Sequence, residues 1–185
     1  MKEGFISKDD LDIYAYGLEL FTSTLGNIII LLALSLIFNR LFETLIVLAV
    51  MLPMQSYAGG YHAKTHLRCF LIMIIGWFPV MWMIDVFNNI SAAIVLSVSI
   101  AVIFVLAPVR HVNVPMSAPR RKTVKLFARL ICLTLVIVSA LLIFFGNSTT
   151  RFGITISVTM GTLALSMLVA YLKNRHEAAS RPDGA

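Results

Sequence analysis

The sequence predicts an all-α integral membrane protein, and its composition and the arrangement of its apolar residues support this. Of the 185 residues, 59% are hydrophobic and only 13% are charged, with a mean hydropathy of +0.90. The apolar residues gather in runs near the roughly 20 residues that a helix needs to cross a bilayer. These runs lack the period-two alternation of a membrane β-barrel. We therefore expect a single membrane domain over residues 1–185, built as a polytopic helical bundle.

Six apolar segments are expected to form the helices, and four to six of them to span the membrane fully. They cover residues 18–38, 41–55, 69–87, 90–109, 124–145 and 151–172. The second segment is the shortest and contains Glu43 and Pro53, so a tilted span, a re-entrant segment and an interfacial helix all remain open. Residues 1–17 have apolar positions at helical spacing and could form an interfacial amphipathic helix. The polar tail 174–185 is expected to be flexible.

The positions of Lys and Arg predict which side of the membrane each connection faces. With six spans and the N-terminus inside, 13 of the 15 cations lie in inside segments, leaving only Arg40 and Arg151 outside. Cytoplasmic loops carry the excess of cations. Both termini, the segment 53–69 and the basic loop 110–123 are therefore expected at the cytoplasmic face of the cell membrane. Because the cations lie at span ends, nucleic acid is not an expected partner.

One short polar segment, residues 55–69, lies between two apolar runs. It reads Gln-Ser-Tyr-Ala-Gly-Gly-Tyr-His-Ala-Lys-Thr-His-Leu-Arg-Cys. Ionisable groups are costly at such a place and usually mark a working site. Cys69 could be a small buried residue or a nucleophile, and Lys64, Arg68 and the start of the next helix would stabilise its thiolate. Cys132 lies in the middle of an apolar segment and is expected to be structural.

His62 is the expected base for Cys69. Seven residues of continuous helix would separate the two by about 10 Å, which is too far for a hydrogen bond. The pairing therefore requires the chain to turn back, and Gly59 and Gly60 supply flexible backbone for that turn. His66 is either a competing base or a solvated loop histidine. A metal site made of the two histidines and the cysteine would lack a visible fourth ligand, so neither a metal nor another cofactor is expected.

A second polar pattern follows the fourth apolar segment. It consists of Ala107-Pro108-Val109, then Asn113 and Pro115, and then Arg120-Arg121-Lys122. The prolines end the preceding helix and keep the following loop extended. The cations could anchor the cytoplasmic side of the membrane domain, or they could bind an acidic peptide or anionic lipid. These two roles are compatible.

Together the two patterns resemble the accessory gene regulator protein B (AgrB) family, membrane endopeptidases of Gram-positive quorum sensing. The family has a Gly-Gly-x-His-Ala segment with a Cys seven residues after the His, matched here by residues 59–63 and Cys69. The Ala-Pro-Val step with its Asn, Pro and basic run matches a second family pattern. The family usually has Arg seven residues before the histidine, where this chain has Gln55. If the family's Arg contacts the substrate or the site, its role in this chain would be relaxed or taken over by Lys64 or Arg68.

The resemblance implies a cysteine endopeptidase that acts on an AgrD-like precursor peptide. Cys69 would attack a peptide carbonyl, and His62 would accept the thiol proton and later protonate the leaving amine. A cysteine of the peptide could then close a thiolactone ring, giving a cyclic autoinducer. The expected peptide-binding residues are Gly59, Gly60, Lys64, Arg68, Arg120, Arg121 and Lys122. The resemblance also implies a homodimer, in a membrane that contains anionic lipids.

Two alternatives from other classes of protein remain open. A transporter or exporter of a peptide or an ion would have polar residues along several spans, often in paired halves. Here the charged residues lie near the predicted ends of the apolar segments instead. A purely structural or partner-binding membrane protein would leave the Gly-Gly-x-His segment and the cationic surroundings of Cys69 without a purpose. Peptide processing is therefore the expected function.

Overall fold

Six α-helices make up the part of the chain that the structure describes, and that part contains no strand. The structure is a computed structural model, and it describes residues 8–59, 66–109 and 118–179. The helices are α1 (Lys8–Ile37), α2 (Leu41–Ala58), α3 (His66–Val86), α4 (Asn89–Leu106), α5 (Ala118–Phe145) and α6 (Thr150–Ala179). The predicted all-α class is therefore confirmed, and each apolar segment corresponds to one helix.

The helices differ from the predicted segments mainly at their ends. α1 begins at Lys8, α5 begins at Ala118 and α6 ends at Ala179, all well outside the apolar runs. Backbone hydrogen bonds continue a helix into polar residues, which hydropathy does not register. The end of α4 has a local cause. Ala107 is extended, with φ −69° and ψ 137°, because the residue before a proline avoids the helical conformation, here before Pro108.

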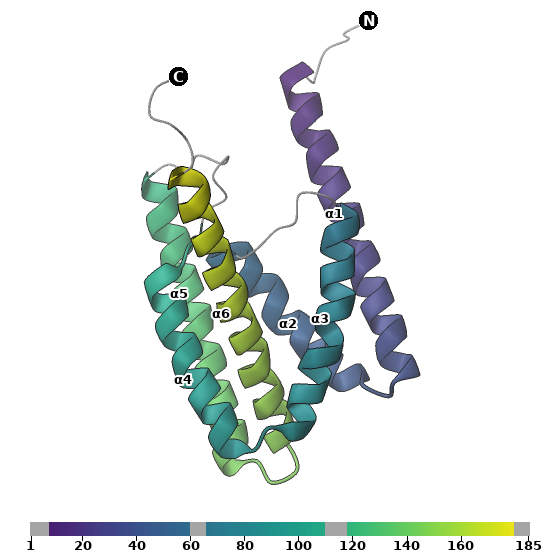
Figure 1. Ribbon diagram of the computed structural model, residues 1–185, viewed down its shortest axis with the longest axis vertical. Coiled ribbons are helices and arrows are strands. Elements are labelled where there is room, and N and C mark those ends of the chain that lie inside the picture. The colour runs from purple at the N-terminus through teal and green to yellow at the C-terminus, as the bar shows by residue number, and fades with distance from the viewer. Residues whose placement is uncertain (1–7, 60–65, 110–117, 180–185) are drawn as a thin grey trace, which may run out of the picture.

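Successive helices run in opposite directions, so their ends gather at two ends of the bundle (Figure 1). One end contains the C-terminal ends of α2, α4 and α6 and the N-terminal ends of α3 and α5. We call it the motif end, because the two sequence patterns lie there. The opposite end, the far end, contains the turns between α1 and α2, α3 and α4, and α5 and α6. The cytoplasmic location of the motif end stays a prediction.

Four helices contain stretches that are long and apolar enough to cross a membrane. These stretches are Leu41–Ala58, Asn89–Leu106, Arg120–Phe145 and Thr150–His176. Within the described residues, α1 and α3 contribute the shorter apolar stretches Thr24–Ile37 and Phe70–Val86. The fold thus fits a multi-pass membrane protein with the four to six spans that the sequence predicts. The shortest predicted segment, which became α2, is one of the four.

α6 lies at the centre of the bundle and packs against α2, α3, α4 and α5. Residues 153–160 are buried on every side of the helix. The polar residues among them form hydrogen bonds, as buried hydroxyl groups require. Thr155 and Thr159 donate to carbonyls one turn earlier, at 2.8 and 2.7 Å, and the hydroxyl of Ser157 is 2.9 Å from that of Ser139 on α5. The bonds of Thr155 and Thr159 stay within α6, whereas the Ser139–Ser157 bond joins α5 to α6.

The packing of α3 is uneven along its length. Over residues 70–86, where the structure describes its side chains, the buried ones are Trp77, Val80, Met81 and Ile84. The indole N–H of Trp77 also donates to the hydroxyl of Thr44 on α2, at 3.0 Å. Residues 70–76 are half-buried or exposed instead. Within residues 70–86, α3 is therefore fastened to the bundle mainly toward the far end, and the helix begins at the motif end (Figure 1).

Candidate active site

α2 ends at Ala58, and Gly59 then turns the chain away from the helix. Gly59 has φ +79° and ψ −173°, and its N–H donates to the carbonyl of Gln55 at 3.2 Å. A residue with a side chain rarely adopts this conformation, whereas glycine does so without strain. The described half of the Gly59-Gly60 pair therefore makes the kind of turn that the pairing of His62 with Cys69 requires. Gly60 itself lies outside the described residues.

The two sequence patterns meet at this turn. The N–H of Val109, just beyond the end of α4, donates to the carbonyl of Ala58 at 3.0 Å. The carbonyl of Val109 lies against Gly59, because a Cβ added to Gly59 would be 2.4 Å from that oxygen. Real Cβ atoms essentially never come so close to a backbone oxygen. The Ala-Pro-Val step and the Gly-Gly segment therefore form one contact between backbones, which depends on a glycine.

Cys69 lies in the first turn of α3, which begins at His66. The N–H groups of a first helical turn have no partner within the helix, and the positive end of the helix dipole is there. Such a position stabilises a thiolate. The prediction that Cys69 stands near a helix start is therefore confirmed for its backbone. His66 and Arg68 belong to the same turn.

Three predicted site residues, Gly60, His62 and Lys64, lie outside the described residues. The pairing of His62 with Cys69 therefore stays a prediction, as do the competing role of His66 and the metal alternative. The other cysteine is placed clearly. Cys132 is fully buried within α5, in the apolar cluster that includes Met54 and Ala58 of α2. This environment suits the structural role expected for Cys132.

The basic run opens α5. Arg120, Arg121 and Lys122 lie in the first turns of the helix, and all three are exposed. Cations are unfavourable at a helix N-terminus, because they face the positive end of the helix dipole. These residues therefore do not serve to stabilise their own helix. Their placement favours an anionic partner outside the chain, and the binding of lipid or an acidic peptide stays a prediction.

Arg129, further along α5, has a role that the sequence did not reveal. Its Nη2 donates to the carbonyl of Phe104 at 3.1 Å, and its guanidinium carbon lies 5.2 Å from the centre of the Phe104 ring. Phe104 is in the last turn of α4, where carbonyls lack helical partners and a cation is favourable. Arg129 thus fastens α5 to α4 just before the Ala107-Pro108-Val109 step. The sequence feature that could have indicated this role is the presence of a cation inside the apolar segment 124–145.

A second polar cluster, which the sequence analysis missed, lies at the far end. Arg40 donates to both carboxylate oxygens of Asp85, at 2.9 and 2.7 Å. Arg151 donates to Glu43 at 2.6 Å and to Asp85 at 2.7 Å. This far-end ion cluster joins the α1–α2 turn, α2, α3 and α6. It neutralises the two arginines that lie outside the predicted cytoplasmic segments.

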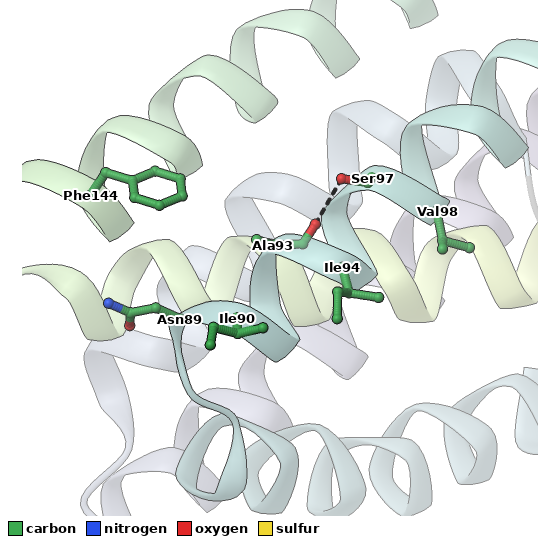
Figure 2. A pocket seen from close by; sticks show the side chains of 7 residues that line it. All are labelled: Asn89, Ile90, Ala93, Ile94, Ser97, Val98 and Phe144. Atoms are coloured by element: carbon green, nitrogen blue, oxygen red, sulfur yellow. Dashed lines mark hydrogen bonds between the residues drawn. The ribbon is translucent and has the colours of Figure 1, made fainter.

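An apolar depression of about 430 Å³ lies on the outer side of α4 toward the far end (Figure 2). It is lined by Asn89, Ile90, Ala93, Ile94, Ser97, Val98 and Phe144. The hydroxyl of Ser97 is already bonded to the carbonyl of Ala93, at 2.9 Å. The lining contains no acid, base or cysteine, and it lies at the other end of the bundle from Cys69. This depression is therefore not the candidate active site.

The comparison with known families covers both sequence patterns. The chain matches the model of accessory gene regulator B over residues 1–169, which include the turn at Gly59 and the helix start at Cys69. The chain belongs to the AgrB family. It is also similar to protein FsrB of Enterococcus faecalis (strain ATCC 47077 / OG1RF), with 42% identity over 60 residues.

The similarity to FsrB is confined to part of each protein. The aligned residues make up 32% of this chain and 25% of FsrB, so the match spans a quarter of that relative's length. No solved structure matches the chain. The match to the family model over residues 1–169 confirms the family that the Gly-Gly-x-His-Ala segment suggested.

Proposed function

We propose that this AgrB-family protein is a membrane cysteine endopeptidase that processes an AgrD-type precursor peptide for quorum sensing. The observation that carries the proposal is the position of Cys69, in the first turn of α3 and seven residues after the motif histidine. A thiolate is favoured at such a helix start. A cysteine near a histidine is a recurrent source of an activated nucleophile. Membership of the AgrB family supplies the class of substrate.

In the proposed reaction, His62 takes the proton of the Cys69 thiol, and the sulfur attacks the carbonyl carbon of one peptide bond. The C–N bond breaks, His62 protonates the leaving amine, and the C-terminal fragment departs. The N-terminal part of the peptide remains as a thioester on Cys69. A cysteine thiol of the peptide then attacks that thioester, which forms a thiolactone and restores the Cys69 thiol. No oxidant, metal or other cofactor takes part.

The location of the site suits this second transfer. Exchange of one thioester for another changes the free energy little, so hydrolysis by water must be kept slow. Cys69 lies at the start of a membrane helix, directly before the apolar stretch Phe70–Val86. The apolar stretch that follows Cys69 would limit access of water to the acyl-enzyme. The exposed cations 120–122 lie at the same end of the bundle and would attract the acidic part of the precursor.

The transporter alternative has little support in the described residues. The buried hydroxyl groups at the centre, such as Ser139 and Ser157, bond to one another and to the carbonyl of Gly153. The carboxylates of Glu43 and Asp85 are paired with arginines at the far end. A conducting path requires polar groups that are free to meet a solute along several spans. Ser139, Glu43 and Asp85 instead form bonds that join one helix to another.

Mass spectrometry of the purified protein in liposomes tests the proposal, with the precursor peptide encoded nearest its own gene. The wild type should release a C-terminal fragment and carry a peptide adduct on Cys69, and the Cys69→Ala variant should do neither. Cys132→Ala is the matched control, because the thiol of Cys132 is fully buried within α5 and its loss should leave the adduct in place. An adduct that persists in Cys69→Ala would remove Cys69 as the nucleophile.

A further inference from the structure

We propose that the Ala107-Pro108-Val109 step is a positioning element for the catalytic segment. Through the backbone of Val109 it holds the C-terminal end of α2, and it thereby fixes the point from which the chain leaves toward His62. The inference rests on the proposed function, because it concerns the same pair of His62 and Cys69. It assigns a role to the second sequence pattern that is independent of charge and of peptide binding.

The first support is the hydrogen bond between Val109 and Ala58. The carbonyl of Ala58 belongs to the last turn of α2, where helical carbonyls lack partners within the helix. Val109 satisfies it at 3.0 Å, so the end of α2 is capped by a residue from a distant part of the chain. Ala58 and Ala107 are both buried, with exposed fractions of 0% and 3%. Val109, which donates the bond, is half-buried, and the Ala58 carbonyl that accepts it is shielded from water.

The second support is the close approach at Gly59. The Val109 carbonyl occupies the space that a side chain on Gly59 would need, as the 2.4 Å separation shows. The positive φ of Gly59 independently disfavours any other residue. Two separate features of this position thus require a glycine. They define the direction of the chain as it leaves α2.

The third support is that the Val109 backbone is itself held in place. The N–H of Ala107 donates to the carbonyl of Ile103 at 2.9 Å, which continues the hydrogen bonding of α4 up to Pro108. One turn earlier, Arg129 of α5 binds the carbonyl of Phe104 at 3.1 Å. The contact at Ala58 and Gly59 is therefore made by a segment that two helices hold. A segment of this kind can position a neighbour.

The short chain between Gly59 and His62 makes such positioning effective. Three residues reach at most about 11 Å when fully extended, so the position of Gly59 sets the outer limit of where His62 can be. A base must stand within hydrogen-bond reach of the proton it accepts. A displacement of about 1 Å at a catalytic group can cost roughly 100-fold in rate. Anchoring Gly59 therefore limits where His62 can be relative to Cys69.

The test measures the rate at which iodoacetamide alkylates Cys69 as a function of pH, without peptide, in the full-length protein in liposomes. A Cys132→Ala background leaves Cys69 as the single cysteine, because the chain has only two. A histidine positioned near a thiol favours the thiolate. It therefore moves the pH midpoint of alkylation below the ordinary cysteine pKa of about 8.5. The His62→Ala variant is the reference, because it gives the pH midpoint of Cys69 alkylation in the absence of the proposed base.

Two variants remove the proposed contact in different ways. Gly59→Ala introduces the Cβ that would collide with Val109, and Val109→Pro removes the N–H that binds Ala58. Both should shift the alkylation midpoint upward, toward that of His62→Ala. Val109→Ala retains the N–H and should shift it less than Val109→Pro. Gly76→Ala is the control for Gly59→Ala, because an added Cβ on that residue of α3 meets nothing within 4 Å.

The outcomes separate this inference from the proposed function. If His62→Ala shifts the midpoint while Gly59→Ala and Val109→Pro, eluting as folded protein, match the wild type, the positioning role is refuted and the catalytic pair stands. If His62→Ala and the wild type share one midpoint, the catalytic pair fails, and the positioning role fails with it. Where Gly59→Ala does not fold, Val109→Pro alone decides, since it retains the glycine at residue 59 and changes only the contact that Val109 makes.

Discussion

Replacing Asp85 by asparagine should lower the thermal stability of the protein, because Asp85 is the acceptor for two arginines from distant parts of the chain. Arg40 binds both of its oxygens, at 2.9 and 2.7 Å, and Arg151 binds one of them at 2.7 Å. The substitution keeps the shape of the side chain and removes its charge. It therefore isolates the electrostatic part of the far-end ion cluster, which links α3 to the α1–α2 turn and to α6.

The size of the effect follows from exposure and from the partners that remain. A hydrogen bond to a charged group contributes about 1.5–3 kcal/mol, whereas an exposed ion pair contributes about 0–1 kcal/mol. The side chains of Asp85 and Arg151 are 40% and 41% exposed, so solvent screening reduces the gain. Glu43 remains beside both arginines, at 2.6 and 3.7 Å, so neither becomes an unpaired charge. We expect a loss of about 1–2 kcal/mol, or roughly 2–8 °C in melting temperature.

The assay is thermal unfolding in nanodiscs, followed by tryptophan fluorescence, in a double-mutant cycle. Asp85→Asn and Arg40→Gln should be non-additive, because their side chains are in contact. Asp85→Asn and Lys122→Gln should be additive, because Lys122 is exposed at the motif end. Raising the salt concentration should reduce the coupling of the first pair. Additive effects for Asp85 and Arg40 at low salt would refute the reasoning.

Three further predictions concern the motif end. His62→Ala should abolish cleavage of the precursor peptide in the liposome assay, whereas His66→Ala should reduce it less, since we assign the base to His62. Arg129→Met should lower the free energy of unfolding by about 1–2 kcal/mol, because the carbonyl at the end of α4 loses a charged donor. Neutralising residues 120–122 to Gln should weaken binding to vesicles that contain anionic lipid by about 1 kcal/mol per cation, measured by flotation.

Each of these predictions has a result that contradicts it. A dispensable His62 together with an essential His66 would show that the base is misassigned. An Arg129→Met variant with the free energy of unfolding of the wild type would show that the bond to Phe104 does not stabilise the fold, and Arg129→Lys, which keeps the charge, separates charge from guanidinium geometry. If the 120–122 variant binds anionic vesicles as well as the wild type at low salt, those cations do not bind lipid. Their remaining role would be to set the membrane topology.

The location of the six helices followed from hydropathy, because each helix contains an apolar run. The helix ends did not follow equally well. The end of α4 could be predicted approximately from Pro108, which forces the preceding residue out of the helical conformation. The start of α5 at Ala118 could not, since the basic residues there break the apolar run without breaking the backbone hydrogen bonds. The central place of α6 was also hidden, because Thr155 and Thr159 are polar although fully buried.

The candidate site shows the same division between local and long-range information. The turn at Gly59 and the place of Cys69 at a helix start depend on neighbouring residues, so the sequence could indicate both. The contact between Val109 and Ala58 depends on how α2 and α4 pack, which no local pattern contains. The far-end ion cluster joins residues 45, 66 and 108 positions apart. The sequence did contain a signal for this cluster: its two cations and two carboxylates lie near predicted helix ends that meet at the same end of the bundle when successive helices alternate in direction.

The burial of α6 has a consequence for how the chain enters the membrane. Within the bundle, 61% of its most apolar stretch is buried, against 22% for the corresponding stretches of α4 and α5. Lipid is therefore the minor part of its surroundings. Inserted alone, Thr155, Ser157 and Thr159 would face hydrocarbon with only their own helix to bond to. Of the six described helices α6 comes last in the chain, so the helices that surround it in the bundle are synthesised before it.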